Sequence, residues 1–383
     1  MFTKNISFKS FNLKKKNKNT IKILHNLLKE DNQIIKSLTK NYKYSFDSRN
    51  LKKFKKYSYF RIIGMGGSIL GAHAIYDFLA NKIKKNFSFI NNITFNNSKI
   101  GSKFVNIIIS KSGNTLETIL NSNKYLKNKN KNIFITENKN NYLNNLAKKI
   151  KSEIVHHNNF IGGRYSVMSE VGMLPAELMG LKPNNFKQFN NLIKNKAFFR
   201  LLISNVNSLL YLIKNKKTNS IIINYDEKSN NLFTWYQQLV AESLGKKGTG
   251  LFPIISNMPK DNHSVMQFYL DGLKNNFFTF FYTHEKESFK LKRNKNFILD
   301  KYLDKKSLNE ITFAQKKATE NIFRRRNIPF RSFEIFERNE KTLGELFTFF
   351  ILETILLGKV LKVNPYNQPS VDLIKMETKK ILI

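Results

Sequence analysis

From Tyr57 onward, short apolar runs alternate with longer segments in which apolar residues recur every three or four positions. The short runs are rich in β-branched and aromatic residues, which is typical of strands buried in a parallel sheet. The longer segments have the apolar spacing of helices. This alternation predicts a doubly wound α/β domain over residues 56–180. The predicted strand and helix pairs are 57–63 with 69–79, 104–110 with 115–126, and 132–138 with 142–150.

The same alternation returns in the second half of the chain and predicts a second doubly wound domain over residues 200–360. A polar and helical linker at 180–200 separates the two domains. The predicted strands and helices are, in order, 220–226, 235–244, 277–283, 308–324, 332–336 and 343–360.

Two extensions flank these domains. Residues 1–55 are polar and rich in Lys and Asn, and the spacing of Ile21, Leu24 and Leu27 predicts short helices there. Residues 361–383 form a tail whose apolar spacing also fits a helix. The predicted fold class is therefore α/β, with two doubly wound parallel sheets and helical N- and C-terminal extensions.

The net charge of +39, from 66 Lys and Arg against 27 Asp and Glu, suggests at first a nucleic-acid partner. The excess is spread along the whole chain, however, and accompanies 34 Phe and 1 Trp. A bias toward AT-rich codons explains all of these features together, so we expect a solvated lysine-rich surface and no specific nucleic-acid partner. The absence of Cys excludes disulfides, thiolate metal sites and cysteine nucleophiles.

No segment predicts a membrane span or a targeting sequence. The apolar segment that begins at Leu346 is interrupted by Glu353 and Lys359 and is too short to cross a bilayer. The first Arg is Arg49, whereas organellar presequences are rich in Arg. We therefore expect a cytoplasmic protein without a membrane partner.

Two glycine clusters lie where nucleotide motifs could occur, and neither fits one. In "GMGGS" at 64–68, the dinucleotide fingerprint would require a glycine or alanine at the position of Ile69. In "GKKGTG" at 245–250, the spacing of a P-loop is missing. The first cluster follows a predicted strand, so Gly66 and Gly67 either let backbone N–H groups approach an oxygen-rich ligand or allow tight strand–helix packing.

The turn "SKSGNT" at 110–115 carries a stronger signal. It follows a buried strand and opens a helix, so hydroxyl groups and unpaired helix N–H groups converge on one point. Such a point suits a phosphate. An ordinary helix cap would account for one hydroxyl, but not for four beside a lysine. The residues concerned are Ser110, Lys111, Ser112, Thr115 and Thr118.

Six motifs together, in order and spacing, resemble the phosphoglucose isomerase (glucose-6-phosphate isomerase) family, most closely its shorter bacterial form. The resemblance runs from about residue 57 to residue 375. The motifs are "GMGGS", "ISKSGNTLET", "GGRYSVMSEVGMLPA" at 162–176, "QLVAESLGK" at 238–246, "DNH" at 261–263 and "NPYNQPSVDLIK" at 364–375.

The resemblance implies two domains of the sugar-isomerase (SIS) type. It also implies reversible isomerisation of D-glucose 6-phosphate to D-fructose 6-phosphate, through ring opening and a cis-enediolate, in glycolysis and gluconeogenesis. No cofactor and no metal are expected. The expected partners are a hexose phosphate and a second copy of the chain, in a homodimer whose active site is shared.

Carried over motif by motif, the resemblance assigns two sets of residues. Asn114 stands where many relatives have Thr, which affects outer contacts only. The implied catalytic residues are Glu242 as base, Arg164 beside the reacting carbons, His263 for ring opening, and Lys375 in the tail. The implied binding residues are Ser68, Ser110, Lys111, Ser112, Thr115, Thr118, Gly66, Gly67, Gly163, Gln238 and Gln368.

The residue types suit this chemistry. A carboxylate such as Glu242 can move a proton between C2 and C1, and its apolar neighbours Val240 and Leu244 indicate a partly buried setting. The always protonated Arg164 can stabilise the developing enediolate, as a metal would otherwise do. His263 and Lys375 can serve as the acid and base of ring opening. Without its motif, each of these residues would more often be a solvated or structural group than a catalytic one.

Three alternatives remain open at this point. A broader isomerase would also accept mannose 6-phosphate, because C2 stereochemistry depends on the shape of the pocket. A non-catalytic phosphosugar-sensing protein would use the SIS fold for binding alone, but it would leave Glu242, His263 and Lys375 unexplained. A basic RNA-binding protein would have an affinity for RNA that survives physiological salt.

Overall fold

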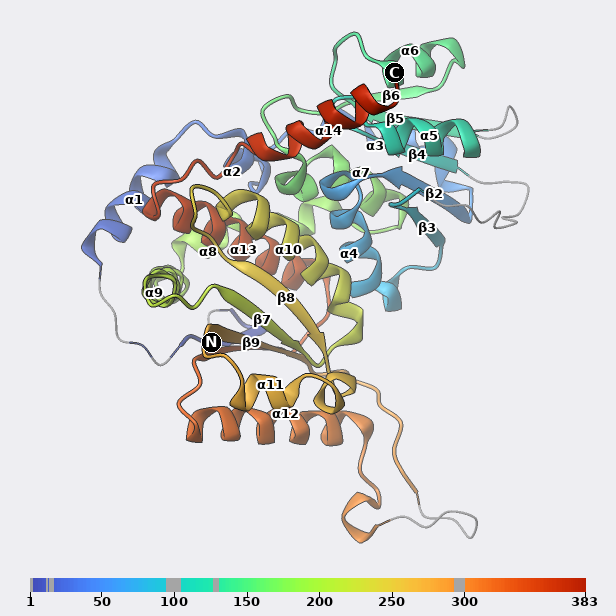
Figure 1. The fold of residues 1–383 in the computed structure, drawn as a ribbon. Helices are drawn as coiled ribbons and strands as arrows, with labels where there is room; N and C mark the ends of the chain where they lie inside the picture. Colours follow the sequence, from blue (N-terminus) through green and yellow to red (C-terminus); the bar gives the residue numbers. More distant parts are fainter. Residues whose placement is uncertain (1–2, 12, 14–16, 94–104, 127–130, 293–299) are drawn as a thin grey trace.

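The computed structural model describes residues 3–11, 13, 17–93, 105–126, 131–292 and 300–383. Within these residues, the chain forms two five-stranded sheets with helices packed around and between them (Figure 1). No helix in the described part of the chain is both long enough and apolar enough to cross a membrane.

The first sheet is wholly parallel, as predicted for the first half of the chain. Its central strands are buried apart from the first residues of β2 and β5, and all five residues of β4 are buried. Phe104, where the predicted strand begins, lies outside the described residues. In spatial order the strands are β3 (Asn86–Ile90), β2 (Tyr59–Gly64), β4 (Val105–Ile109), β5 (Lys131–Thr136) and β6 (Glu153–His156). The helices after β2, β4 and β5 are α4 (Leu70–Phe78), α5 (Leu116–Tyr125) and α6 (Tyr142–Lys149).

The second sheet repeats this strand order in its parallel part and adds one antiparallel edge strand. That strand, β1, comes from the N-terminal extension. The extension therefore contains a strand in addition to the short helices that were predicted there. In spatial order the strands are β1 (Ile6–Lys9), β10 (Phe330–Ile335), β9 (Asn276–Thr283), β7 (Asn219–Asn224) and β8 (Phe252–Asn257). Its helices include α10 (Asn230–Leu244), α11 (Met266–Asp271) and α12 (Leu308–Arg325).

The remaining helices cover the sheets or connect them, and the predicted helical extensions at both ends are present. The N-terminal helices are α1 (Lys18–Lys29), α2 (Gln33–Ser37) and α3 (Ser48–Lys55). Between the sheets in the chain come α7 (Glu170–Leu178), α8 (Phe189–Lys194) and α9 (Lys196–Lys214). The C-terminal helices are α13 (Glu340–Val360) and α14 (Pro369–Ile381).

Helix α13 is the centre of the core. Every residue from Thr342 to Gly358 is buried, and an apolar helix of this kind needs neighbours on all sides. Those neighbours include α1, α9 and α10. The apolar segment after Leu346 is therefore a core helix, covered by the N-terminal helix α1 and by helices of the linker and the second half.

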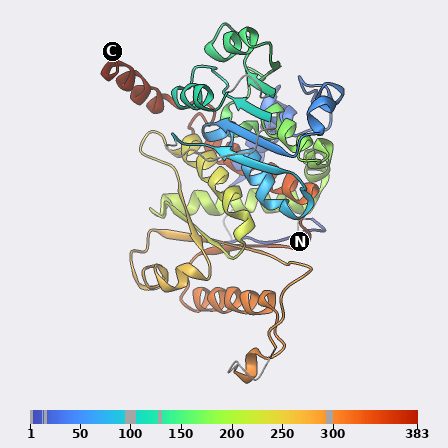
Figure 2. The ribbon, with the colours of Figure 1, turned by 90° about the vertical axis from the view of Figure 1, so that its right-hand side faces the viewer.

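Helix α14 contrasts with α13. Figure 2 shows it standing out from the body of the molecule at the C-terminus. Its apolar side chains remain in solvent; Leu373 is 66% exposed and Ile374 is 71% exposed.

Candidate active site

The first sheet has a switch point between β2 and β4. From β2 the chain crosses through α4 to β3 on one side, and from β4 it crosses through α5 to β5 on the other. At such a point the carboxyl ends of two adjacent strands open a crevice for a ligand. Gly64 and Ile109, the last residues of the two strands, are paired. The turns at 64–68 and 110–115 therefore lie side by side.

The glycines of the first turn allow three backbone segments to meet. Gly66 has a φ of +51°, and a Cβ on it would lie 2.6 Å from Nε2 of Gln238. A Cβ on Gly67 would lie 2.1 Å from the carbonyl carbon of Gly163. The positive φ favours glycine at 66, and the close approach of backbone to backbone requires it at 67. The turn thereby lies against α10 and against the 3₁₀ helix η3 (Gly163–Met168). The partly exposed Ser68 lies on the same turn.

The second turn is held by its own hydroxyl groups. The Ser110 hydroxyl, which is 2% exposed, hydrogen-bonds the Thr115 hydroxyl at 2.8 Å and accepts the N–H of Gly113 at 3.2 Å. The Ser112 hydroxyl accepts the N–H of Asn114 at 3.3 Å. Two of the predicted phosphate ligands thus contact each other directly at the start of α5.

Lys111 and Thr118, which were also predicted to bind phosphate, lie differently. The Nζ of Lys111 donates to the carbonyl of Asn159 at 2.8 Å and lies 3.4 Å from a carboxylate oxygen of Glu137. Its charge is therefore directed to the 159–162 loop. The Thr118 hydroxyl is buried and has no hydrogen-bond partner among the described residues.

A carboxylate and a guanidinium face each other beside these turns. Oε2 of Glu242 lies 3.3 Å from Nη1 of Arg164, and Oε1 accepts a hydrogen bond of 2.8 Å from Nε2 of Gln238. Gln238 and Glu242 are one turn apart on α10, so their side chains share a face. The Glu242 side chain is 25% exposed and the Arg164 side chain only 2%. Solvent reaches the pair from the carboxylate side.

Arg164 is fixed by hydrogen bonds to the C-terminal strap, which we define as residues 364–368. Nη2 donates to the carbonyls of Pro365 at 2.7 Å and Asn367 at 3.1 Å, and Nη1 donates to Oε1 of Gln368 at 2.5 Å. A buried guanidinium needs such partners for most of its donors. The predicted residues Arg164, Glu242, Gln238 and Gln368 therefore form one connected group.

Two residues of this group were not predicted. Ser243 accepts a hydrogen bond of 2.8 Å from Nε of Arg164 and forms another of 2.8 Å with the Tyr165 hydroxyl. Tyr165 also donates to the carbonyl of Pro365 at 3.0 Å. Ser243 directly follows Glu242 in the sequence, and Tyr165 directly follows Arg164. This adjacency was the only sequence signal that could have pointed to Ser243 and Tyr165.

Lys375, the predicted catalytic lysine, belongs to the C-terminal tail. It lies on α14, exposed to solvent. Gln368 directly precedes the first residue of that helix, and its side chain accepts a hydrogen bond from Arg164. Seven residues are about two helical turns, so Lys375 lies on nearly the same face as Gln368, about 10 Å further along the axis.

His263 is remote from the group. It is exposed in a 3₁₀ helix, η6 (Lys260–His263), beyond the carboxyl end of β8. Helix α10 connects the parallel strands β7 and β8, so it runs antiparallel to both strands. Glu242 is in the last turn of α10 and therefore lies near the amino end of β8. The two residues are therefore at opposite edges of the second sheet, separated by the length of a six-residue strand, about 20 Å.

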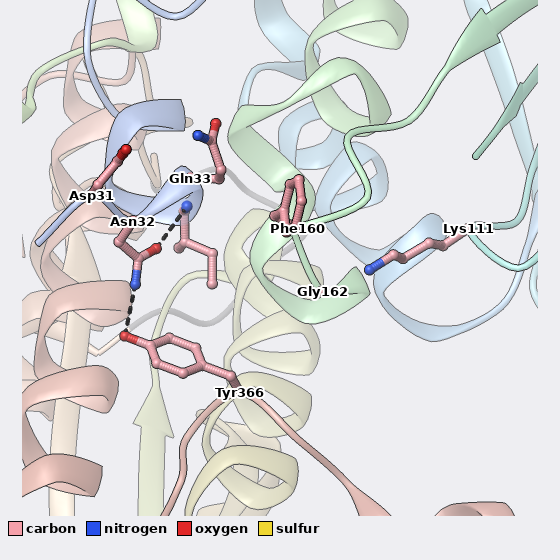
Figure 3. A pocket seen from close by; sticks show the side chains of 8 residues that line it. Asp31, Asn32, Gln33, Lys111, Phe160, Gly162 and Tyr366 are labelled. Atoms are coloured by element: carbon pink, nitrogen blue, oxygen red, sulfur yellow. Dashed lines mark hydrogen bonds between the residues drawn. The ribbon is translucent and has the colours of Figure 1, made fainter. Parts of the chain in front are cut away.

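A cavity of about 520 Å³ adjoins the site on the side of the 159–162 loop (Figure 3). The side chain of Asn32 donates to the Tyr366 hydroxyl at 2.9 Å, which joins α2 to the C-terminal strap across this cavity. Neither Glu242 nor Arg164 lines it, so the candidate chemistry lies beside the cavity. The lining residues are Asp31, Asn32, Gln33, Ile34, Lys111, Phe160, Gly162 and Tyr366.

Two doubly wound sheets with the same strand order, and a serine-rich turn at the switch point of the first, define an α/β protein of the sugar-isomerase fold. Among solved structures, a hypothetical protein from Thermus thermophilus has a similar fold, with a TM-score of 0.82 and 21% identity over 95% of this chain and 94% of that one. A glucose-6-phosphate isomerase from Chlamydia trachomatis gives a TM-score of 0.68 at 21% identity, over 88% of this chain and 72% of that one.

Sequence comparison defines the family. Residues 3–251 match the model of the family described as phosphoglucose isomerase. The chain is 32% identical to a glucose-6-phosphate isomerase of Methanocaldococcus jannaschii, over 87% of this chain and 86% of that protein. It is 34% identical to one of Mycoplasmopsis pulmonis, over 84% and 82%. The chain belongs to the phosphoglucose isomerase family.

Proposed function

We propose that this chain catalyses the reversible isomerisation of D-glucose 6-phosphate and D-fructose 6-phosphate. The observation that carries the proposal is the pair formed by Glu242 and Arg164, 3.3 Å apart, beside the serine-rich turn at the switch point of the first sheet. Membership of the phosphoglucose isomerase family supports the choice of substrate.

The turn at 110–115 would bind the phosphate group. Its hydroxyls, above all Ser110 and Thr115, and the N–H groups at the start of α5 are suitable donors to a dianion. Helix α5 also carries a partial positive charge at this end. Binding here would place the sugar carbons toward the neighbouring turn at 64–68 and toward Arg164.

Glu242 would act as the base that moves a proton between C2 and C1. One of its oxygens is hydrogen-bonded to Gln238, which orients the carboxylate. Removal of a proton next to a carbonyl gives an enediolate, and the fixed charge of Arg164 would stabilise it. A guanidinium held in place in this way provides positive charge without exchanging protons with the intermediate.

Ring opening would use His263 and Lys375. Because His263 lies at the opposite edge of the second sheet from Glu242, a second copy of the chain is the natural source of the histidine at each site. We therefore propose a homodimer with two active sites, each built from both subunits. We also propose that the enzyme is cytoplasmic. Lys375 would act from α14, on the same helix face as Gln368.

The test is a coupled assay on the purified protein. With fructose 6-phosphate as substrate, formation of glucose 6-phosphate is followed through its oxidation by an added dehydrogenase, with and without EDTA. We expect turnover in both conditions. Mannose 6-phosphate, tested in parallel, measures the breadth of the pocket. Binding of glucose 6-phosphate without any turnover would contradict the proposal and would favour a sensing protein.

A further inference from the structure

The glycine-rich turn at 245–250, which is not a P-loop, holds one lysine in a fixed place. A Cβ on Gly245 would lie 2.7 Å from the carbonyl oxygen of Ala241, so the chain turns sharply where α10 ends. Lys246 and Thr249 exchange backbone hydrogen bonds of 3.1 and 3.0 Å. Gly250, with a φ of +136°, completes the turn. The backbone of Lys246 is therefore well defined, four residues beyond Glu242.

The ammonium of Lys246 joins the end of α10 to the C-terminal strap. Its Nζ donates to the carbonyl of Ser243 at 3.0 Å and to the carbonyl of Asn364 at 2.6 Å. Ser243 is the residue after Glu242, and Asn364 is the first residue of the strap. Charge-assisted hydrogen bonds of this kind are about twice as strong as neutral ones.

Two cations thus hold one short segment of backbone. Lys246 binds the carbonyl at the start of the strap, and Arg164 binds the carbonyls of Pro365 and Asn367 further along. The charged groups that act on the Lys246 ammonium are Arg164 of η3, which repels it, and Glu242 of α10, which attracts it. Burial, followed by the nearby Arg164, lowers the pKa of Lys246 to about 8.

We propose that Lys246 is a positioning residue, which pins the C-terminal strap to the end of α10 and thereby sets the location of Gln368 and of the helix that carries Lys375. Only the kinetic test of this role, described below, rests on the proposed isomerase function. The strap follows the core helix α13 and precedes the exposed helix α14, so the contacts of Lys246 and Arg164 anchor the start of α14.

The first test needs no activity. Hydrogen–deuterium exchange of residues 361–383 is compared by mass spectrometry in the native protein, Lys246→Met, Lys246→Arg and the exposed neighbour Lys247→Met. We expect exchange in the strap to accelerate about 10-fold or more in Lys246→Met, as expected for local opening, and to remain near native in the other two. Native exchange in Lys246→Met, with an unchanged melting temperature, would overturn the proposal.

The second test is kinetic. If the strap positions Gln368 and Lys375, Lys246→Met should lower kcat about 10- to 100-fold, because small misplacements of reacting groups cost rates of this size. In the native protein, kcat should decline as the pH rises through about 8. Lys246→Arg, whose charge persists, should move this decline to higher pH, and an unmoved decline would contradict the role of Lys246. If the native protein does not isomerise hexose phosphates, the proposed function fails, while the exchange experiment still decides the role of Lys246.

Discussion

Glu242 meets Arg164 with its carboxylate turned toward solvent and the guanidinium behind it. Oε2 and Nη1 are 3.3 Å apart, yet the first side chain is 25% exposed and the second 2%. A ligand that enters the crevice therefore reaches the carboxylate first. The hydrogen bonds of Arg164 to the strap and to Ser243 fix the charge behind it, which is the arrangement that preorganised electrostatic stabilisation requires.

The first prediction concerns the serine-rich turn. The double variant Ser110→Ala, Thr115→Ala removes two hydroxyls that are 2.8 Å apart, so phosphorylated sugars should bind more weakly. Loss of two charge-assisted hydrogen bonds predicts an increase in KM of about 10- to 1000-fold. Inorganic phosphate should compete with the substrate in the native protein and more weakly in the variant.

Ser122→Ala is the matched control for this prediction. Its hydroxyl is also buried on α5, where it donates to the carbonyl of Thr118 rather than facing the turn. KM should stay near native in this variant. Phosphate that fails to compete at any concentration would show that the turn is no anion site.

The second prediction concerns the shared site. Glu242→Gln and His263→Ala should each be inactive alone, because each removes one group from every site. After subunit exchange at equal mixing, about half of the dimers are mixed and each has one intact site, so about one quarter of the native activity should return. If mass spectrometry demonstrates exchange and no activity returns, His263 does not act across an interface.

The second sheet has a switch point of its own, between β7 and β9, and it is closed by side chains. Nη2 of Arg338 lies 2.8 Å from carboxylate oxygens of both Asp226 and Glu285. The Thr283 hydroxyl donates to Asp226 at 2.9 Å. The side chains of Arg338 and Asp226 are 3% and 7% exposed. This crevice is therefore filled by an ion pair, in contrast to the crevice of the first sheet.

The third prediction follows from this closed crevice. Arg338→Met would leave Asp226 buried without its cation, which predicts a loss of about 3–5 kcal/mol in the free energy of unfolding. Arg326→Met is the control, because its pair with Asp271 is about half exposed and should contribute at most about 1 kcal/mol. Urea unfolding of both variants measures the difference. Equal effects would mean that the buried pair contributes no more than a surface pair.

A buried lysine near the N-terminal segment gives a pH-dependent prediction. The ammonium of Lys187 donates to the carbonyls of Ser37 and Met168 and lies 5.1 and 4.9 Å from the ring centres of Tyr42 and Tyr44. Burial lowers the pKa of Lys187 to about 7. In the unfolded chain the same group has a pKa of about 10.4.

Between these two pH values the unfolded chain binds more protons at Lys187 than the folded chain does. The free energy of unfolding should therefore rise as the pH increases from about 7 toward 10. The fourth prediction is that Lys187→Met weakens this rise and that Lys182→Met, an exposed neighbour, preserves it. Urea unfolding at several pH values from about 6.5 to about 9.5 measures the slopes. Equal slopes in native protein and Lys187→Met would contradict the assignment.

The strands that the sequence pattern predicted are the interior strands of the two sheets, and those that it missed are the four edges. An interior strand is buried on both faces and reads as an apolar run, as in β4 and β9. An edge strand is partly exposed and loses that signal; β8 even contains Pro253, which an edge tolerates. The missed strands are β1, β3, β6 and β8.

The candidate site also contains residues that the sequence could predict and residues that it could not. Local motifs singled out the two turns, Arg164 and Glu242 as candidates, and the structure brings them together. The motifs did not identify Ser243, Tyr165 or Lys246 as supports, because those contacts join residues that are 78 or more positions apart in the sequence. No local pattern encodes such pairs. The positions of His263 and Lys375 relative to Glu242 remain predictions about the assembled and liganded protein.

The fifth prediction concerns Glu242 as the base that moves the proton between C2 and C1. The native protein and Glu242→Gln are incubated with glucose 6-phosphate in D₂O, and deuterium at C2 is followed by NMR, with binding measured separately by calorimetry. The amide keeps the shape of the side chain but accepts no proton, so incorporation should fall by roughly 10²–10⁴ or more while the dissociation constant changes little. Deuterium incorporation by Glu242→Gln at nearly the native rate would show that Glu242 is not the base.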